Sequence, residues 1–186
     1  MLRRLLLTCL VLLPLDLAAQ NSTPAPKDTP EAEATEPPMT LDRLDTILRA
    51  LDPDLQSNGT MWQLNINEVQ VLVVTDESAD RIRAITPVAK SDEVSTDDMQ
   101  RILQANFDTA LDARYALAKD ILWSAFIHPL KPLEKDQLIS GLGQVVNLAQ
   151  SYGTLYSGGA LQYGGGDSGA LQRALIDDLL KKGEEI

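Results

Sequence analysis

One stretch of this sequence carries the residue types of a nucleophilic catalyst. Gly166-Asp-Ser-Gly169 copies the residues that surround the nucleophilic serine of trypsin-like proteases. Such a serine also needs a histidine base, a carboxylate that orients this base and an oxyanion hole. His128 is the only histidine in the sequence, so it would have to serve Ser168. Because the match is a short run of common small residues in a glycine-rich stretch, a serine hydrolase using Ser168 and His128 is the alternative interpretation.

Other catalytic or metal-binding sets are incomplete in the sequence. Cys9 is the only cysteine, and a single histidine without further cysteines cannot build a typical zinc site. Tyr163-Gly-Gly-Gly-Asp167 lacks the lysine of a phosphate-binding P-loop. The acidic pairs Asp97-Asp98 and Asp177-Asp178 suit the first turn of a helix and a solvated helix face. We therefore predict a protein that is not an enzyme, with no catalytic or metal-binding residues and no cofactor.

The first residues have the pattern of an export signal. Met1-Leu-Arg-Arg4 is positively charged, residues 5–13 are almost continuously apolar, and Leu17-Ala-Ala19 ends in small residues. This order is typical of a secretory signal peptide, and the apolar run is shorter than the roughly 20 residues that span a membrane. We expect cleavage between Ala19 and Gln20, and a mature protein without a membrane span that is periplasmic or secreted. A retained membrane anchor and lipid attachment at Cys9 are the alternatives.

The chain is acidic, and its composition changes sharply along its length. It has 27 Asp and Glu residues against 16 Lys and Arg residues, a net charge of −11, which disfavours nucleic acids and anionic membrane surfaces as partners. Residues 21–38 are dominated by proline, threonine, alanine and glutamate and contain no bulky apolar residue, so they cannot form a core. The predicted segments are a signal peptide over 1–19, a disordered acidic Pro-rich tether over 20–39, one folded domain over 40–156, and a Gly-rich linker with a short C-terminal helix over 157–186.

Hydrophobic periodicity predicts a mixed α+β domain. The expected elements are a helix over 41–51 capped by Thr40, strands over 62–66, 69–75 and 81–88, a helix capped by Ser95, strands over 112–119 and 121–128, and a helix containing 138–149. Tight turns between the strands imply an antiparallel sheet flanked by helices on one face, in the order α-βββ-α-ββ-α.

Particular side chains are assigned to the core of this domain. Apolar residues at helical spacing predict that Met99, Ile102, Leu103 and Phe107 face inward from the second helix. Trp62 and Trp123 lie at strand positions, where packing in the core is the preferred interpretation over exposed binding anchors. Gly141 and Gly143 weaken the third helix by roughly 1 kcal/mol each relative to alanine, unless close packing needs them.

The order of elements and several stretches of sequence resemble bacterial proteins with the type III secretion chaperone fold, in particular the YbjN-like branch. Val71-Leu-Val-Val-Thr-Asp76, Leu122-Trp-Ser-Ala-Phe-Ile-His-Pro-Leu130 and Gly141-Leu-Gly-Gln-Val-Val-Asn147 carry this resemblance. It implies a helix-on-sheet fold and a tendency to dimerise. Secretion chaperones bind an extended client segment in the cytoplasm. The export signal takes this chain elsewhere, so the resemblance implies the fold and not the secretion-chaperone role.

These observations favour a non-catalytic, exported protein-binding module of the bacterial cell envelope. A chaperone-like role is one version of this function. Leu72 and Val74 face one way in their strand, and Val69, Val71 and Val73 face the other. Helices on one side cover only one of these faces. The other requires a partner, the C-terminal segment, or exposure as an apolar patch. We expect a protein partner and a homodimer formed through the sheet or its flanking helices.

Overall fold

The computed structural model describes residues 36–108, 111–153 and 170–184. Its elements are α1 (Leu41–Leu51), β1 (Gln56–Ser57), β2 (Met61–Ile66), β3 (Val69–Asp76), β4 (Arg81–Lys90), the short 3-10 helix η1 (Ser91–Glu93), α2 (Thr96–Asp108), β5 (Arg114–Ala118), β6 (Ile121–His128), α3 (Lys135–Ser151) and α4 (Ala170–Gly183). Within these residues, six strands form one antiparallel sheet in the order β1-β2-β3-β4-β6-β5. The α+β fold class is confirmed, with the short strand β1 added to the predicted order.

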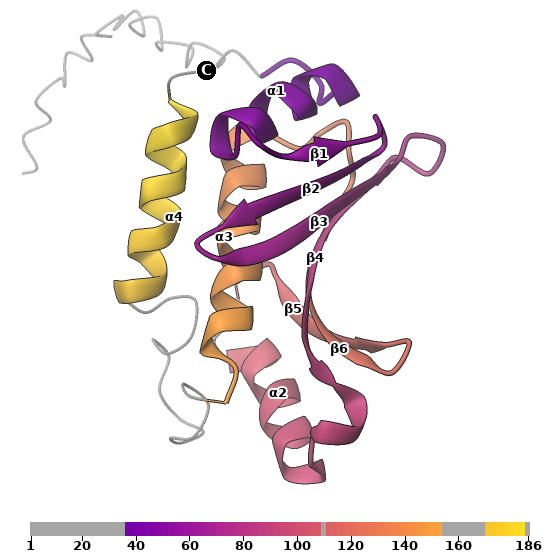
Figure 1. Cartoon of the computed structure of the whole chain (residues 1–186), viewed down its shortest axis with the longest axis vertical. Helices are drawn as coiled ribbons and strands as arrows, with labels where there is room; N and C mark the ends of the chain where they lie inside the picture. Colours follow the sequence, from indigo (N-terminus) through magenta and orange to yellow (C-terminus); the bar gives the residue numbers. More distant parts are fainter. Residues whose placement is uncertain (1–35, 109–110, 154–169, 185–186) are drawn as a thin grey trace, which may run out of the picture. The chain divides into compact units, whose positions relative to one another are not determined.

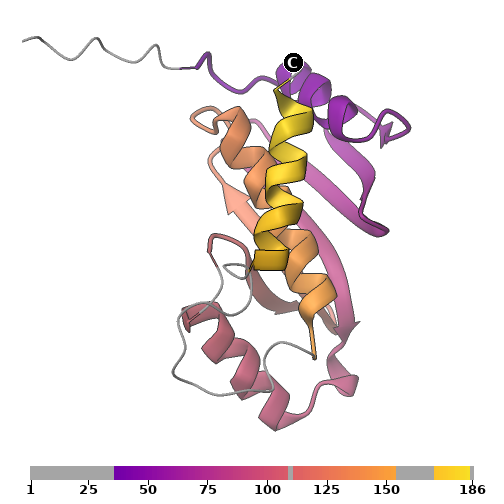
Figure 2. The same ribbon diagram turned by 90° about the vertical axis from the view of Figure 1, so that its left-hand side faces the viewer.

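The helices lie on one face of the sheet (Figure 1). Helix α3 runs along the sheet and contacts β3, β4, β5 and β6, whereas α1 packs on β2 and α2 on β5. Helix α4 packs against the far side of α3, in front of it in Figure 2. Across the described segments, no helix combines the length and apolar composition that a membrane span requires. One face of the sheet is therefore closed by helices, and no described helix covers the other.

Caps and turns define the ends of α1, β2 and β3. Thr40 caps α1 as predicted, because its Oγ1 accepts a hydrogen bond from the Arg43 N–H at 3.2 Å. The hairpin turn between β2 and β3 is formed by Asn67 and Glu68, whose φ angles of 49° and 66° suit a two-residue turn. In the turn before β2, the Asn58 side chain accepts hydrogen bonds from the N–H groups of Thr60 and Met61.

Alternation along β2 and β3 places the core as the sequence predicts. Trp62 and Leu64 are buried and lie opposite Val73 and Val71 on the closed face of the sheet. On α3, buried residues surround nearly the whole helix, because the sheet covers one side and α4 covers the other. Helix α3 is therefore buried on two opposite sides.

Two glycines allow α3 to approach both of its neighbours. A Cβ atom on Gly141 would lie 2.9 Å from the Phe126 ring of β6, and one on Gly143 would lie 2.8 Å from Cγ1 of Ile176 in α4. Both distances are shorter than ordinary van der Waals contact. Close packing therefore accounts for the two residues that the sequence identifies as weakening the helix.

The inward face predicted for α2 is wrong in part. Ile102 is buried and Met99 half-buried, but Leu103 is 62% exposed and Phe107 is 82% exposed. The helix packs on β5 through the side that carries Ile102, Ala105 and the carboxamide of Asn106. Leu103 and Phe107 are one helical turn apart and share another side of the helix. Periodicity identified an apolar helix but not which apolar residues face the sheet.

Strand ends also differ from the prediction. Strand β4 continues to Lys90 because a bulge between Pro87 and Ala89 lets it pair with β6 beyond the proline. Strand β5 begins at Arg114, because the preceding N–H groups of Asp112 and Ala113 donate to Oε1 of Gln144 in α3 instead.

Residues on both sides of the predicted 40–156 domain contact it. Met39 is 2% exposed, and its N–H donates to the Lys131 carbonyl at 3.0 Å. Glu36 pairs with Arg43 and accepts a hydrogen bond from the Lys135 N–H at 3.0 Å. At the other end, the Lys135 Nζ atom donates to the carbonyl of Gly183 in α4 at 2.9 Å. The end of the predicted tether and helix α4 thus both belong to the folded unit.

Candidate functional site

The structure describes one member of the catalytic pair in the alternative hydrolase interpretation. His128 ends β6, and its ring stacks on that of Phe126 with centroids 5.9 Å apart and an interplanar angle of 10°. Its Nδ1 atom lies 2.8 Å from the carbonyl oxygen of Pro129. Ser168 and the predicted cleavage site at Ala19 and Gln20 lie outside the described residues. These interpretations therefore stay predictions.

The acidic pairs have local partners or lie on the surface. In the cap of α2, the Asp98 N–H donates to Ser95 Oγ, and the Asp98 carboxylate accepts from the Ser95 hydroxyl and pairs with Arg101 at 3.3 Å. Asp177 and Asp178 are exposed on α4. Within the described parts of the chain, no group of three or more His, Cys, Asp or Glu residues is placed to hold a metal ion.

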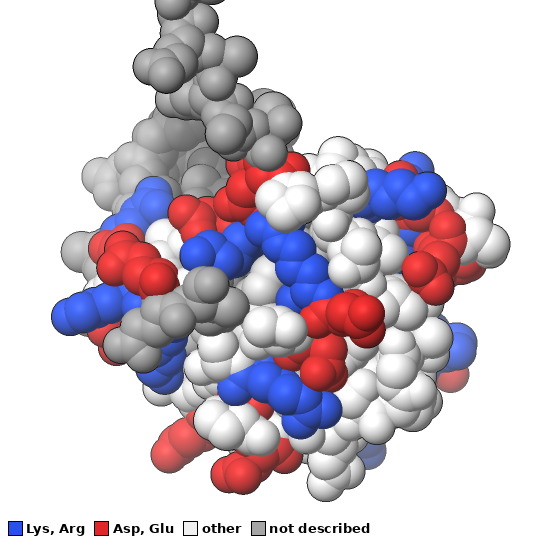
Figure 3. Space-filling view, turned by 90° about the horizontal axis from the view of Figure 1, so that it is seen from above, with Lys and Arg blue, Asp and Glu red and all other residues white. Residues whose placement is uncertain are grey.

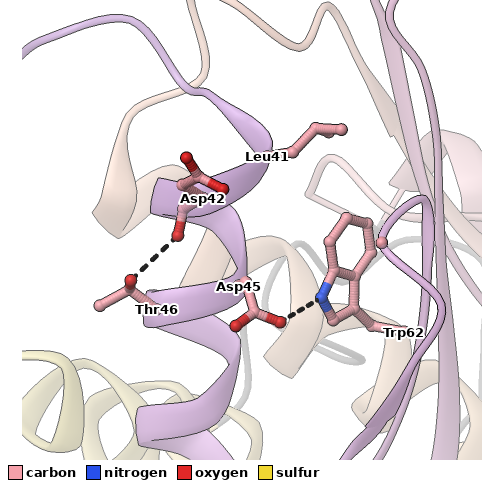
Figure 4. Close-up of a pocket in the computed structure, with 6 residues that line it drawn as sticks. Leu41, Asp42, Asp45, Thr46 and Trp62 are labelled. Carbon is pink, nitrogen blue, oxygen red and sulfur yellow. Dashed lines mark hydrogen bonds between the residues drawn. The ribbon is translucent and has the colours of Figure 1, made fainter.

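A pocket of about 340 Å³ lies between α1 and the start of β2 (Figure 4). The Trp62 Nε1–H donates to one carboxylate oxygen of Asp45 at 2.8 Å, and the Arg49 Nε–H donates to the other at 2.8 Å. The hydrogen bond from Arg49, then that from Trp62, lowers the pKa of Asp45 below its ordinary value. Thr46 donates to the backbone carbonyl of Asp42 at 2.9 Å. The Trp62–Asp45 hydrogen bond joins α1 to β2, and the Arg49 and Thr46 hydrogen bonds lie within α1, so the polar groups of the pocket have structural roles.

The face of the sheet opposite the helices is the more informative surface, and we call it the open sheet face. Strand alternation and the register of β2, β3, β4, β6 and β5 place these residues on it: Met61, Gln63, Asn65, Gln70, Leu72, Val74, Asp76, Arg81, Arg83, Ile85, Arg114, Trp123, Ala125 and Ile127. Ile127 is 56% exposed and Met61 is 40% exposed. Leu72, Val74, Ile85 and Trp123 are half-buried by their neighbours in the sheet. Apolar side chains therefore run across several adjacent strands without a helix above them.

Arg83 lies at the centre of this face. Its cross-strand neighbours are Val74 on β3 and Ile127 on β6, so apolar side chains flank it on both sides. Arg81 lies two residues earlier on the same strand, and both arginines are exposed. Among the described residues, Arg83 forms no ion pair with a carboxylate. Positive charge is thus presented within an apolar surface of an acidic protein.

The two tryptophans occupy opposite faces of the sheet. Trp62 is 1% exposed in the core, as predicted. Trp123 lies on the open sheet face instead, half-buried, and its Nε1–H donates to the Ala118 carbonyl at 2.9 Å. Trp123 shares a face of β6 with Ala125 and Ile127, and that face is the one without helices. A core position for Trp123 is therefore wrong.

The end of the domain that carries α1 has a mixed distribution of charged side chains. Figure 3 shows acidic and basic side chains interspersed there, so no single sign of charge dominates that view. The Glu36–Arg43 and Asp45–Arg49 ion pairs belong to this region. Neutralised charges of this kind are ordinary for a solvated surface.

Sequence reasoning identified that a second sheet face needs a cover, but not its arginines. The signal was present, because Arg81 and Arg83 alternate with the buried residues Ile82 and Ala84. What the sequence did not supply was the register that places Arg83 between Val74 and Ile127.

Comparison with known proteins gives few matches. No protein-family model matches the chain, and no curated protein matches it. Among solved structures, the chain is similar to a chain in the structure of the HopA1–SchA chaperone–effector complex. The TM-score is 0.46, the sequences are 10% identical, and the match covers 59% of this chain and 91% of that chain. The resemblance to the YbjN-like branch stays a prediction.

Proposed function

We propose that this protein is a non-catalytic protein-binding module that acts through the open sheet face. The observation that carries the proposal is the combination of apolar side chains and arginines on a sheet face that no described helix covers. Contiguous exposed apolar surface of this kind marks interaction sites in soluble proteins.

The composition of this face suits a protein partner. Protein interfaces are enriched in tryptophan, methionine and arginine at the positions that contribute most to binding. Trp123 on β6, Arg83 on β4 and Met61 on β2 supply these types on the open sheet face. The net charge of −11 opposes nucleic acids, because their binding depends on neutralising phosphates.

We place the module outside the cytoplasm, in the bacterial cell envelope. Support comes from the order of charged, apolar and small residues over 1–19. Mass spectrometry of the exported protein tests this placement. The expected mature chain begins at Gln20, and an intact chain from Met1 found only in the cytoplasm would contradict it.

Comparative affinity capture tests the binding function. The full protein, an Ile127→Ser variant and an Asp178→Ser control are used to capture proteins from the envelope fraction of the producing cells. Ile127 is exposed, so its replacement leaves the core intact, and Asp178 is exposed on α4 away from the sheet. Proteins retained by the unaltered chain and by the control, and lost with Ile127→Ser, support the proposal. Identical capture by all three would contradict it.

A control for catalysis uses Ser168, the nucleophile of the alternative hydrolase interpretation. Because the proposed function has no chemical step, Ser168→Ala is expected to leave capture and biological activity unchanged. Loss of activity in a folded Ser168→Ala protein would instead support the hydrolase interpretation.

A further inference from the structure

We infer that the open sheet face binds an extended acidic segment of its protein partner, with carboxylates at alternate positions followed by apolar residues. This inference rests on the proposed function and names the chemistry of the partner. It is carried by the arrangement of side chains along β4 and its two neighbouring strands.

The charged half of this arrangement lies at one end of β4. Arg81 and Arg83 are two residues apart on the same face, which separates them by roughly 7 Å along the strand. Carboxylates at positions i and i+2 of an extended segment have the same spacing. Arg81 donates to the Asp80 carbonyl, whereas Arg83 has no ion-pair partner among the described carboxylates. A carboxylate above Arg83 would therefore meet a guanidinium that is free to bind it.

The apolar half continues along the same strand. Ile85 follows Arg83 at the next position on this face and lies between Leu72 and Ala125. Beyond it, Trp123 lies opposite Pro87. A segment that places two carboxylates over the arginines would thus place its next two sheet-facing side chains over an apolar surface. Apolar side chains there would bury surface, and charged ones would lose hydration without a partner.

A second copy of this chain fits the same face poorly. Asp76 is the only acidic residue among the described strand positions on the open sheet face, and it lies opposite Arg81 at the rim. Its Oδ1 atom already accepts hydrogen bonds from Ser78 Oγ at 2.6 Å and the Ala79 N–H at 3.0 Å. Two faces of this composition would bring arginines together without enough carboxylates to pair them.

An anionic membrane surface also fits less well than a peptide segment. A membrane is an extended plane of charge, so it would meet much of a domain whose chain carries a net charge of −11. A short segment senses mainly charges within about 8 Å at physiological ionic strength. Over that distance the arginines dominate the open sheet face.

Peptide binding to the full-length mature chain tests the inference. The probe is a blocked peptide of sequence Thr-Glu-Thr-Glu-Thr-Leu-Thr-Leu-Thr, which presents both glutamates and both leucines on one side when extended. Matched peptides carry glutamine or lysine in place of glutamate. Trp123 fluorescence reports binding on this face, and Trp123→Phe shows whether the signal arises there, because Trp62 is buried on the opposite face.

The expected result is a preference for carboxylates that depends on Arg83. We expect the glutamate peptide to bind about tenfold more tightly than the glutamine peptide, as hydrogen bonds between charged groups imply. Arg83→Gln should abolish this preference, and Arg83→Glu should reverse it in favour of the lysine peptide. Arg101→Gln is the control, because Arg101 pairs with Asp98 on α2 and should not affect binding.

Each other outcome overturns the inference in a distinguishable way. Equal binding of the glutamate and glutamine peptides would show an apolar surface without charge selection, and the protein-binding function would stand. No binding of any peptide, or a preference for the lysine peptide by the unaltered protein, would exclude the acidic segment. Arg83-dependent dimerisation, or tighter Arg83-dependent binding to phosphatidylglycerol vesicles than to the peptide, would assign the face to a second copy or a membrane. Failure of the capture experiment, by contrast, would remove the protein-binding function itself.

Discussion

At the level of single residues, Gly143 sets how closely α3 and α4 approach. Its missing side chain leaves room for Ile176, whose Cγ1 atom would lie 2.8 Å from a Cβ at this position. Alanine is favoured over glycine in helices by about 1 kcal/mol, so an unhindered substitution would stabilise α3. The short distance to Ile176 predicts instead that alanine at this position destabilises the protein.

We expect Gly143→Ala to lower the free energy of unfolding by about 1–3 kcal/mol, because overpacking a core forces neighbouring atoms to move. Urea unfolding measures this change. The matched background is Ile176→Ala, which removes the atom that the new Cβ would meet, and there Gly143→Ala should cost much less. A stability gain in the unaltered background would show that α4 does not press on Gly143.

Asp45 is the residue that joins α1 to the core strand β2. Its two oxygens accept from Trp62 and Arg49, and these hydrogen bonds favour the ionised carboxylate. We expect Asp45→Ala to cost roughly 1–3 kcal/mol, because the buried Trp62 Nε1–H loses its acceptor. Arg49→Ala should cost at most about 1 kcal/mol, because it removes only a surface ion pair.

The contribution of Asp45 should also depend on pH. Its folded-state pKa is lowered from 3.8, so the carboxylate stabilises the fold fully above that value. This stabilisation is lost as the pH falls through the lowered folded-state pKa. The stability difference between the unaltered protein and Asp45→Ala should therefore be constant from neutral pH down to mildly acidic pH and shrink under strongly acidic conditions. Chemical unfolding across this range measures it, and a difference that grows on acidification would contradict the assignment.

At the level of elements, a side chain of α2 protects the outer edge of β5. The Asn106 carboxamide donates to the Tyr115 carbonyl at 3.0 Å and accepts from the Tyr115 N–H at 2.8 Å. In a similar way, Oε1 of Gln144 accepts hydrogen bonds from the N–H groups of Asp112 and Ala113, which precede this strand. Unpaired strand edges promote association between sheets, and these two side chains occupy part of this edge.

Asn106→Ala should therefore have two effects. The free energy of unfolding should fall by roughly 1–3 kcal/mol because two backbone groups lose their partner, and aggregation on mild heating should increase. Gln104→Ala is the control, since Gln104 is exposed on the same helix. Unfolding midpoints and light scattering provide the measurements. Equal behaviour of both variants would show that the carboxamide does not protect the edge.

We propose that the predicted self-association uses the exposed pair Leu103 and Phe107 of α2. They lie one turn apart on one side of the helix and form an apolar ridge that the sheet does not cover. We expect the mature protein to form a dimer through this ridge, and the double variant Leu103→Gln, Phe107→Ser to be monomeric. Ile127→Ser, on the open sheet face, should leave the molar mass unchanged.

Light scattering over a range of concentrations measures both results. A monomer at high concentration would contradict self-association altogether. Loss of the dimer in Ile127→Ser would instead place the contact on the open sheet face.

Elements with strong local signals were predictable from the sequence. The strict alternation of Trp62, Leu64 and Ile66 and the turn at Asn67 and Glu68 specify β2, its faces and its hairpin. Strand β1 was missed because it is only two residues long and its second residue, Ser57, was assigned to the turn before β2. Which side chains of α2 are buried depends on the side of the helix that packs on β5. Whether Trp123 is in the core depends on the face of the sheet that the helices cover. Both depend on tertiary packing, which hydrophobic periodicity does not reveal.

At the level of the whole molecule, all described helices lie on one side of the sheet. Helix α4, one of the candidate covers for the second face, packs on the far side of α3 instead. The open sheet face is therefore left with apolar residues and with Arg83 at its centre. This asymmetry connects the fold to the proposed binding function, because the sheet face without helices is exposed to a partner.

Site-specific photo-crosslinking in living cells tests this claim most directly. A photoreactive side chain is placed at Ile127 on the open sheet face, and in a matched variant at Asp178 on α4, both of which are exposed. The account predicts discrete protein adducts from position 127, reduced by a second change at Arg83, and none of these adducts from position 178. Adducts that form equally from both positions, or from position 178 alone, would contradict it.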